Sequence, residues 1–229
     1  MRKALTIFLI AIFLINSSAR KPFFATNTLY FEATGTPDVT PATTGWTSSG
    51  SAIVRPILPN GFKSATTIAS TNITVDNSSS SATTLFYRGV SPALVAQTIS
   101  GTVTGYFRMD VSNATGCTAQ TRVKIFLVNK AGTATNTLLA ITAGASNLTT
   151  TLTSYQALNA ANLTSQSCND GDRLVIEVGI GRSAGTTNRS GDISFGSSSS
   201  TDISSAGSTT ANNPNLVFSN AITFYKGIY

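Results

Sequence analysis

Apolar and polar side chains alternate with a period of two through much of this chain, and the alternation is clearest over residues 172–182. Successive side chains of a strand point to opposite faces of a sheet, so this alternation indicates a half-buried strand. One face carries Leu174, Ile176, Val178 and Ile180. The other face carries Glu177 and Gly179, interrupted by Val175. We therefore predict a strand whose apolar face belongs to a core.

Similar runs recur along the rest of the chain, separated by segments rich in Gly, Pro, Asn and Ser. They predict strands at 24–33, 52–58, 64–75, 83–90, 97–112, 121–128, 137–142, 148–155, 191–196 and 216–225. Pro56 makes the second run an expected edge strand, because proline donates no ladder hydrogen bond. Gly101 and Gly105 indicate a bend or a bulge within the run 97–112. Residues 157–163 are expected to form a single helical turn.

Together these elements predict an all-β fold: an antiparallel two-sheet β-sandwich, most closely a jelly roll, of about ten strands. No strand–helix–strand alternation appears, which disfavours a parallel sheet. The chain is long enough for one such domain, which we place at residues 20–229. Side chains of the run 97–112 that are expected to face the core are Val103, Phe107, Met109 and Val111. Those expected to face outward are Thr102, Thr104, Tyr106, Arg108 and Asp110.

Charged residues are scarce in this chain, at 10% of the total compared with about 25% in ordinary domains. The hydrophobic fraction of 41% is nevertheless too high for a disordered polar tract. The formal net charge is +6, but the basic residues are spread singly, and the closest pair is Arg122 and Lys124 on one predicted strand face. Because nucleic-acid and lipid surfaces need clustered charge, we expect scattered solvated charges and no nucleic-acid partner.

The amino terminus has the layout of a secretory signal peptide. Arg2 and Lys3 precede an apolar run at 4–15, and Ser17 and Ala19 are small residues at the −3 and −1 positions of a cut after Ala19. An apolar run this short does not reach the roughly 20 residues that a membrane-spanning helix needs. We therefore expect a leader at residues 1–19 and no membrane span in the mature chain. An uncleaved anchor and a misassigned start codon are the alternatives.

Cys117 and Cys168 are the only cysteines, and each precedes a strand-like run. A disulfide between them would close a loop of about 50 residues and stabilise the fold by roughly 4 kcal/mol in the loop-entropy model. Export would favour this bridge, because disulfides persist in oxidising compartments. The alternative is a pair of partly buried free thiols.

Histidine is absent from the chain. Its absence removes Ser-His-Asp and Cys-His nucleophilic machinery and the commonest zinc ligand. A glycosidase needs only two carboxylates about 5–10 Å apart, and Glu32 and Glu177 are the only glutamates. Glu177 lies opposite the apolar face of its strand, so it either lines a concave sheet or is an exposed strand carboxylate, and the second is the simpler interpretation. We expect a protein that is not an enzyme and has no cofactor.

Candidate binding residues fall into two groups. Asp170 and Asp172 resemble a fragment of an oxygen-rich calcium loop, although no Glu completes an EF-hand pattern and a strand-starting turn explains the same residues. Trp46, Tyr87 and Tyr106 are aromatic side chains that a ligand such as a glycan could contact. For Trp46, a core position beside Gly45 is the competing and simpler interpretation. The polar segments 34–50, 76–82 and 197–213 are the expected recognition loops.

Several short runs occur in an order that resembles an uncharacterised family of β-rich proteins from tailed-phage and environmental viral genomes. The runs are Leu29-Tyr30-Phe31 with the following Gly-Thr-Pro loop and Gly45-Trp46, then 96–103, 170–179, 191–196, Thr201-Asp202 and 213–219. The likeness covers most of residues 27–220, and Asn215 stands where the family has an aromatic residue after Asn-Pro. The family has no assigned catalytic residues, so the resemblance implies none here.

These observations lead to a ranked set of expected functions. The resemblance implies a non-enzymatic structural or decoration protein of a phage particle, which would self-associate or bind other virion proteins. The leader indicates instead an exported surface or fibre subunit that assembles by strand addition. A carbohydrate-binding module is the third expectation. The corresponding locations are the virion, or the cell exterior if the leader functions.

Overall fold

A computed structural model describes residues 23–32, 34–42, 45–48, 52–59, 73–74, 82–185, 187, 189–195, 201–210 and 212–226. Every regular element in these ranges is a β-strand, so the predicted all-β class is confirmed. No helix within the same ranges is long and apolar enough to cross a membrane. The predicted leader 1–19, most of the predicted strand 64–75 and the loop 76–81 lie outside the described residues.

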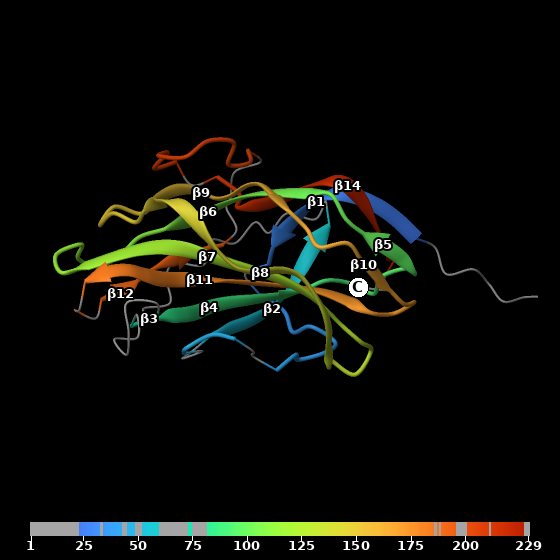
Figure 1. The fold of residues 1–229 in the computed structure, drawn as a ribbon. Helices are drawn as coiled ribbons and strands as arrows, with labels where there is room; N and C mark the ends of the chain where they lie inside the picture. Colours follow the sequence, from blue (N-terminus) through green and yellow to red (C-terminus); the bar gives the residue numbers. More distant parts are fainter. Residues whose placement is uncertain are drawn as a thin grey trace, which may run out of the picture.

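Fourteen strands are present in this part of the chain (Figure 1). They are β1 (Phe23–Phe31), β2 (Ile53–Pro59), β3 (Ile73–Thr74), β4 (Thr83–Val90), β5 (Gln97–Ile99), β6 (Thr102–Met109), β7 (Cys117–Val128), β8 (Ala134–Asn147), β9 (Thr153–Asn162), β10 (Gln166–Cys168), β11 (Arg173–Gly185), β12 (Ser190–Gly191), β13 (Ile193–Ser194) and β14 (Asn215–Tyr225). The predicted strand at 172–182 is β11, which is longer than expected at its carboxyl end.

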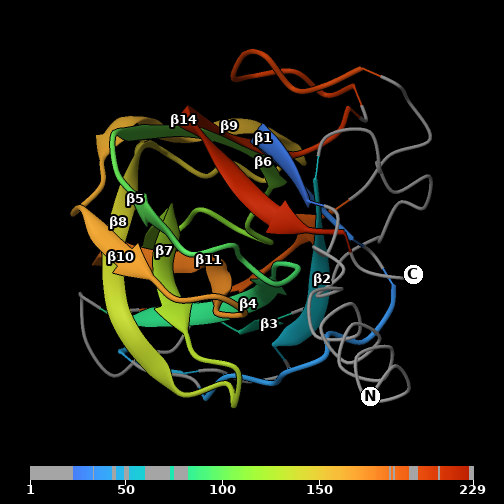
Figure 2. The same cartoon turned by 90° about the vertical axis from the view of Figure 1, so that its right-hand side faces the viewer.

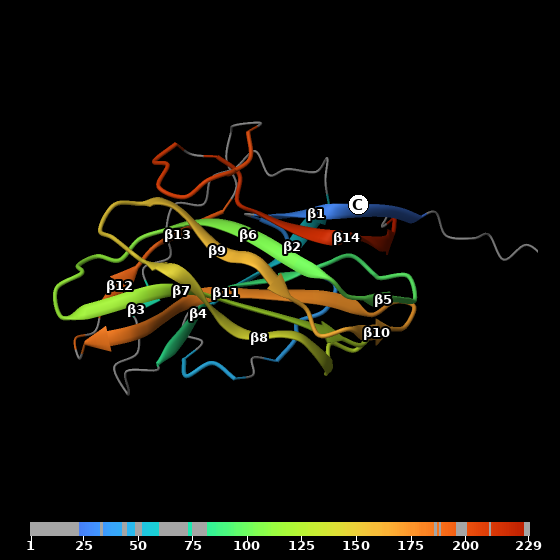
Figure 3. The ribbon, with the colours of Figure 1, turned by 45° about the horizontal axis from the view of Figure 1, so that its top comes forward.

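Ten of these strands form one large sheet in the order β13-β6-β14-β1-β2-β4-β11-β7-β8, with β9 paired to β6. The sheet folds over on itself. Strands β1, β14, β6 and β9 lie on one side of the molecule and β4, β11 and β7 on the other, with β2 and β8 at the two lateral margins (Figure 2). Two small ribbons, β5–β10 and β3–β12, lie at opposite ends of the molecule (Figure 3).

The large sheet is mixed, so the prediction of a purely antiparallel arrangement is wrong at one pairing. Strand β2 runs parallel to β4 through Ile53–Pro56 and antiparallel to β1 through Ile57–Pro59. The predicted edge position of β2 is therefore also wrong. Each residue of β2 nevertheless has a strand partner on one side only. Pro56 is tolerated for that reason, because its missing N–H removes no second ladder bond.

The core fills the space between the two sides of the folded sheet, and the predicted alternation is confirmed there. The inward side chains of β6 and β11 are fully buried: Val103, Phe107, Met109, Leu174, Ile176, Val178 and Ile180. Aromatic rings link the two sides, with the Tyr87 centroid 5.5 Å from that of Phe31 and 3.9 Å from that of Phe195. Tyr87 is completely buried and its hydroxyl donates to the Glu32 carbonyl. It is a core residue, so the prediction that it contacts a ligand is wrong.

The predicted helical turn at 157–163 is strand instead. Residues 153–162 form β9, which pairs with β6 through register shifts on both sides of Gly105. At these shifts two consecutive residues, Ala157 and Leu158, are both buried, which interrupts the alternation of a regular strand. The predictions for the glycines of 97–112 are confirmed: Gly101 has a φ of 94° and separates β5 from β6, and Gly105 lies at the bulge.

Cys117 and Cys168 are both buried and both free, so the structure contains no disulfide between them. Cys117 pairs with Gly185 at one end of β7, whereas Cys168 belongs to β10, close to the start of β11 at the other end (Figure 1). Strand β7 alone is about 36 Å long at 3.3 Å per residue. A disulfide joins Cα atoms that are only about 4.4–6.8 Å apart, so the predicted bridge cannot form within one folded chain.

The two thiols should react slowly with a thiol reagent in the native protein and fully in denaturant. Burial raises the pKa of both Cys117 and Cys168, which lowers the fraction of reactive thiolate at neutral pH. A disulfide reagent that releases a coloured thiolate when it reacts with a cysteine measures the rate of this reaction by absorbance. An intact mass two hydrogens lower before reduction than after it would contradict this expectation.

Candidate functional site

The outer face of the β4-β11-β7 side is covered by residues 34–42 and 45–48 of the connection between β1 and β2, which contact it through Asp38, Pro41 and Trp46. We call these residues the covering segment 34–48. Glu177 lies under this cover with no solvent exposure, so the interpretation as an exposed strand carboxylate is wrong. Alternation correctly placed Glu177 opposite the core. It did not indicate that a second layer of chain covers that face, because the covering segment is distant in sequence.

The Glu177 carboxylate is held by side chains from three different segments. Arg88 of β4 donates from Nε to Oε1 over 2.8 Å, and its second terminal nitrogen lies 2.7 Å from the same oxygen. Trp46 of the covering segment donates from its indole nitrogen to Oε2 over 2.6 Å. Lys124 of β7 places its ammonium 3.9 Å from Oε2. We call Glu177, Arg88, Lys124 and Trp46 the Glu177 cluster.

The cluster brings together residues that neighbouring strands place side by side. Glu177 is the register partner of Arg88 on β4 and of Lys124 on β7, so the three side chains share one face. Cross-strand partners of opposite charge stabilise a sheet. Burial lowers the pKa of Lys124, while Glu177 acts in the opposite direction and Arg88 in the same direction. Lys124 also lies 4.7 Å from the ring centroid of Phe126, a cation–π contact.

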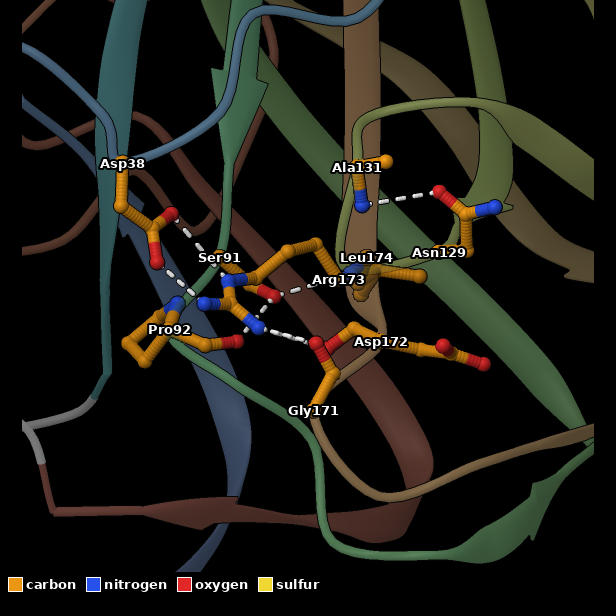
Figure 4. Close-up of polar contacts among 9 residues, drawn as sticks. All are labelled: Asp38, Ser91, Pro92, Asn129, Ala131, Gly171, Asp172, Arg173 and Leu174. Carbon is orange, nitrogen blue, oxygen red and sulfur yellow. Dashed lines mark hydrogen bonds and ion pairs between the residues drawn. The ribbon is translucent and has the colours of Figure 1, made fainter.

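Further contacts fix the covering segment lengthwise along β11. Asp38 pairs with Arg173, and Arg173 also donates to the Gly171 carbonyl (Figure 4). Arg88 reaches past Glu177 to donate to the Pro41 carbonyl over 2.5 Å. The segment ends in a bridge to β4, where Ser48 donates from its backbone N–H to the Thr83 carbonyl over 3.0 Å. The covering segment is thereby held at Asp38, Pro41 and Ser48.

A small apolar cluster supports the same segment. It consists of Phe126, Val128 and Val175, with Val39 packed against it. Val175 interrupts the polar face of β11, and this position under Val39 explains its presence there. The outer layer therefore has its own apolar contacts beside the Glu177 cluster.

Trp46 is not part of the main core, so the interpretation as a core residue is wrong. Its ring is half-buried on the outer face, where Cζ3 lies 2.8 Å from the position that a methyl group on Gly179 would occupy. The sequence did not reveal this position, because the residues that hold the ring come from β11. As a half-exposed ring, Trp46 still fits the prediction of an aromatic side chain that a ligand could contact.

Asp170 and Asp172 take part in the turn that begins β11. Asp170 accepts the Ala96 backbone N–H over 2.7 Å, and Asp172 accepts the Asn169 backbone N–H over 2.8 Å. The Ala96 hydrogen bond lowers the pKa of Asp170, with a smaller contribution from Tyr225. No group of three or more His, Cys, Asp or Glu side chains is placed to hold a metal ion within the described ranges.

A second covering segment, 201–210, lies over the outer face of β6. Arg108, predicted to face outward into solvent, is 8% exposed and donates to the Thr209 carbonyl over 3.0 Å. Burial lowers its pKa. The Tyr30 hydroxyl donates to Asp202 over 2.7 Å and fixes the start of the segment. Tyr106, two positions before Arg108, is half-buried on the same face.

The comparisons with known proteins give no further assignment. The sequence matches no protein-family model, and it has no significant match among curated proteins. Inference about function therefore depends on the geometry above.

Replacing Glu177 with Gln should destabilise the protein by about 3–5 kcal/mol, because it leaves buried cations without their counter-charge. Asp38→Asn is the matched control. It breaks an ion pair whose carboxylate side chain is 58% exposed, so it should cost about 1 kcal/mol or less. Urea denaturation followed by circular dichroism measures both. Equal costs for the two variants would contradict a structural role for the Glu177 cluster.

Away from the Glu177 cluster, two acidic residues are neighbours where β6 ends and β13 begins: Asp110 and Asp192. Asp110 donates its backbone N–H to the Asp192 carbonyl over 3.1 Å, and Asp192 donates its own to Asp110 Oδ1 over 3.0 Å. Burial raises the pKa of Asp110; the hydrogen bond from Asp192 opposes this shift, and the Asp192 charge adds to it. A raised folded-state pKa means that the stabilisation is present at low pH and is lost as pH rises through that pKa.

Asp110→Asn should therefore raise the melting temperature at pH 7, since the amide keeps the acceptor and removes the penalised charge. The difference from the unmodified protein should vanish at acidic pH, where Asp110 is protonated. Thermal melts across a pH series measure this, with Asp170→Asn as control. The pKa of Asp170 is lowered, so that substitution should lower the melting temperature at pH 7. A destabilised Asp110→Asn protein at pH 7 would contradict the assignment.

Proposed function

We propose that this chain is a non-enzymatic structural subunit exposed on the surface of a phage particle. The fold that we propose for it is a two-sheet jelly roll. The order of the eight long strands supports this assignment, because β1-β14-β6-β9 lies opposite β4-β11-β7-β8 and the first strand pairs with the last. Two Greek keys wrapped into two sheets have this order, and the fold is common in capsid and lectin domains.

The observation that carries the proposal is that most carboxylates bind groups of the protein itself. Nine acidic residues occur in the chain, and all except Asp76 lie in the described ranges. Seven of those eight accept a hydrogen bond or pair with arginine: Glu32, Asp38, Asp110, Asp170, Asp172, Glu177 and Asp202. They fix turns and covering segments to the sheet. General acid–base chemistry needs carboxylates directed at a substrate, and this arrangement favours a structural role instead.

The two covering segments provide the surface that the proposed role requires. Segments 34–48 and 201–210 are each fixed to a strand face by buried polar contacts. Loops that are held in one conformation lose little conformational entropy when they bind a partner. The resemblance to β-rich proteins of tailed-phage genomes adds to the proposal and supplies the particle as its setting.

An exported fibre or surface subunit is the second candidate, and one observation favours it. On one side, β1 pairs with β14 from residue 23 onward. On its other side, only the last three residues of β1, 29–31, pair with β2. Phe23 is 63% exposed at the start of this strand. Within the described ranges, the free edge of β1 at 23–28 is suited to strand addition by another chain.

Mass spectrometry of particles separated on a density gradient tests the proposal. Peptides of this chain should co-sediment with the major particle proteins in a fixed ratio across the particle peak. Recovery only from the culture medium or the cell surface, with none in the particle peak, would contradict the particle assignment and favour the exported subunit. Electron microscopy of the purified chain separates the two further, because strand addition predicts filaments.

A further inference from the structure

The outer face of β11 contains two glycines that leave room beside the covering segment. Gly179 and Gly181 follow Glu177 on the same face of the strand, so they are about 7 Å apart. A side chain at Gly179 would collide with the Thr84 carbonyl and with Trp46, and one at Gly181 would collide with Arg122. We call these two residues the glycine floor. Their missing side chains allow the Trp46 and Arg122 side chains to lie directly on the sheet.

The two side chains that lie on the floor are adjacent. Trp46 covers Gly179, and Arg122 is the register partner of Gly179 on β7. The Arg122 side chain extends along the strand so that its Nε is 2.5 Å from the position of a methyl group on Gly181. A half-buried indole and a half-buried guanidinium therefore lie over neighbouring positions of the same strand face.

Both groups are fixed before any ligand arrives. The indole N–H of Trp46 is committed to Glu177, which sets the position of the ring. Arg122 donates to the Gln120 side-chain oxygen and to the Thr121 carbonyl, each over 3.2 Å. These acceptors are neutral, and other donors of the guanidinium remain for a further acceptor. A binding group held in place by its neighbours pays less entropy on binding.

Hydroxyl and amide groups border the floor. Gly181 pairs with Gln120 on β7 and with Thr83 on β4, so both side chains share the face of the floor. Thr47 lies against Thr83, with the two hydroxyl oxygens 3.5 Å apart. Each of these oxygens accepts the other residue's backbone N–H, and one hydroxyl donates to the other, which leaves the proton of the second hydroxyl as a donor.

Charge indicates the class of ligand. Around the floor lie three cationic side chains, Arg88, Lys124 and Arg122, and the carboxylate of Glu177. Glu177 is occupied by Arg88, Lys124 and Trp46. Arg122 is the half-exposed cation of this set, and a guanidinium matches the geometry of a carboxylate.

We propose that Trp46, Arg122 and the glycine floor form a binding site for an acidic saccharide, with a pyranose ring against the Trp46 indole and a uronate carboxylate on the Arg122 guanidinium. Gln120 and the Thr47 and Thr83 hydroxyls bind the ring hydroxyls. An amphipathic ring that is apolar on one side and polar at its edge matches this combination of groups. The site is independent of the particle assignment, because an exported subunit would carry it equally.

Tryptophan fluorescence tests the site directly, because Trp46 is the only tryptophan in the chain. The probes are trigalacturonate and its neutral counterpart galactotriose, added to the full-length protein at up to millimolar concentration. Trigalacturonate should change the intensity or the maximum of the Trp46 emission in a saturable way. Added salt should weaken binding, because the exposed part of the ion pair is screened.

Arg122→Gln should reduce trigalacturonate affinity at least tenfold, and Arg122→Lys should reduce it less. Arg189→Gln is the matched control, since it removes the same charge from a residue that binds the Thr115 carbonyl beyond the start of β7. Circular dichroism melts confirm that each variant folds. Three results would overturn the proposal: no saturable change with trigalacturonate, equal affinity for galactotriose, or an Arg122→Gln protein that binds as well as Arg189→Gln.

Discussion

The buried carboxylate of Glu177 is the interaction on which the outer half of this molecule depends. It joins β4, β7 and β11 to the segment that crosses them, through Arg88, Lys124 and Trp46. A buried charge is costly unless it is paired and hydrogen-bonded, so each of these partners stabilises the others. Loss of a charged partner leaves an unbalanced charge at Glu177, whose side chain is fully buried. The cluster therefore fixes Pro41 and Trp46 of the covering segment against the sheet.

The inner and outer faces of the sheet therefore have different roles in this fold. The apolar core between the two sides of the folded sheet provides the stability, and its residues come from the inward faces of the long strands. The outer faces hold segments 34–48 and 201–210 in place through charged and polar contacts. A rigid sheet that holds ordered surface segments is a general way to place recognition groups. The proposed particle surface role and the proposed saccharide site both depend on this arrangement.

The alternation of apolar and polar residues predicted burial correctly where a strand buries one face. It predicted burial wrongly where a segment distant in sequence covers the other face. The alternation in β6 and β11 placed the inward residues correctly, because the period of two is a property of the strand itself. Trp46, Tyr87 and Arg108 were misplaced, because their burial depends on which strands and loops lie against them. The helical turn expected at 157–163 is replaced by strand β9, which has register shifts opposite Gly105. The sequence alone allowed a disulfide between the cysteines, yet Cys117 lies at one end of the β7–β11 pair and Cys168, in β10, lies near the other.

The sequence by itself determined the all-β class, the faces of the long strands and the turn that begins β11. Alternation, glycine positions and turn residues are local signals, and they act over a few residues of chain. Only the tertiary structure decided the parallel pairing of β2 with β4, the burial of Glu177 and the meeting of Trp46 with Arg122. Each of these joins residues more than 30 positions apart in the chain, and their register is fixed only when the whole sheet closes around its core.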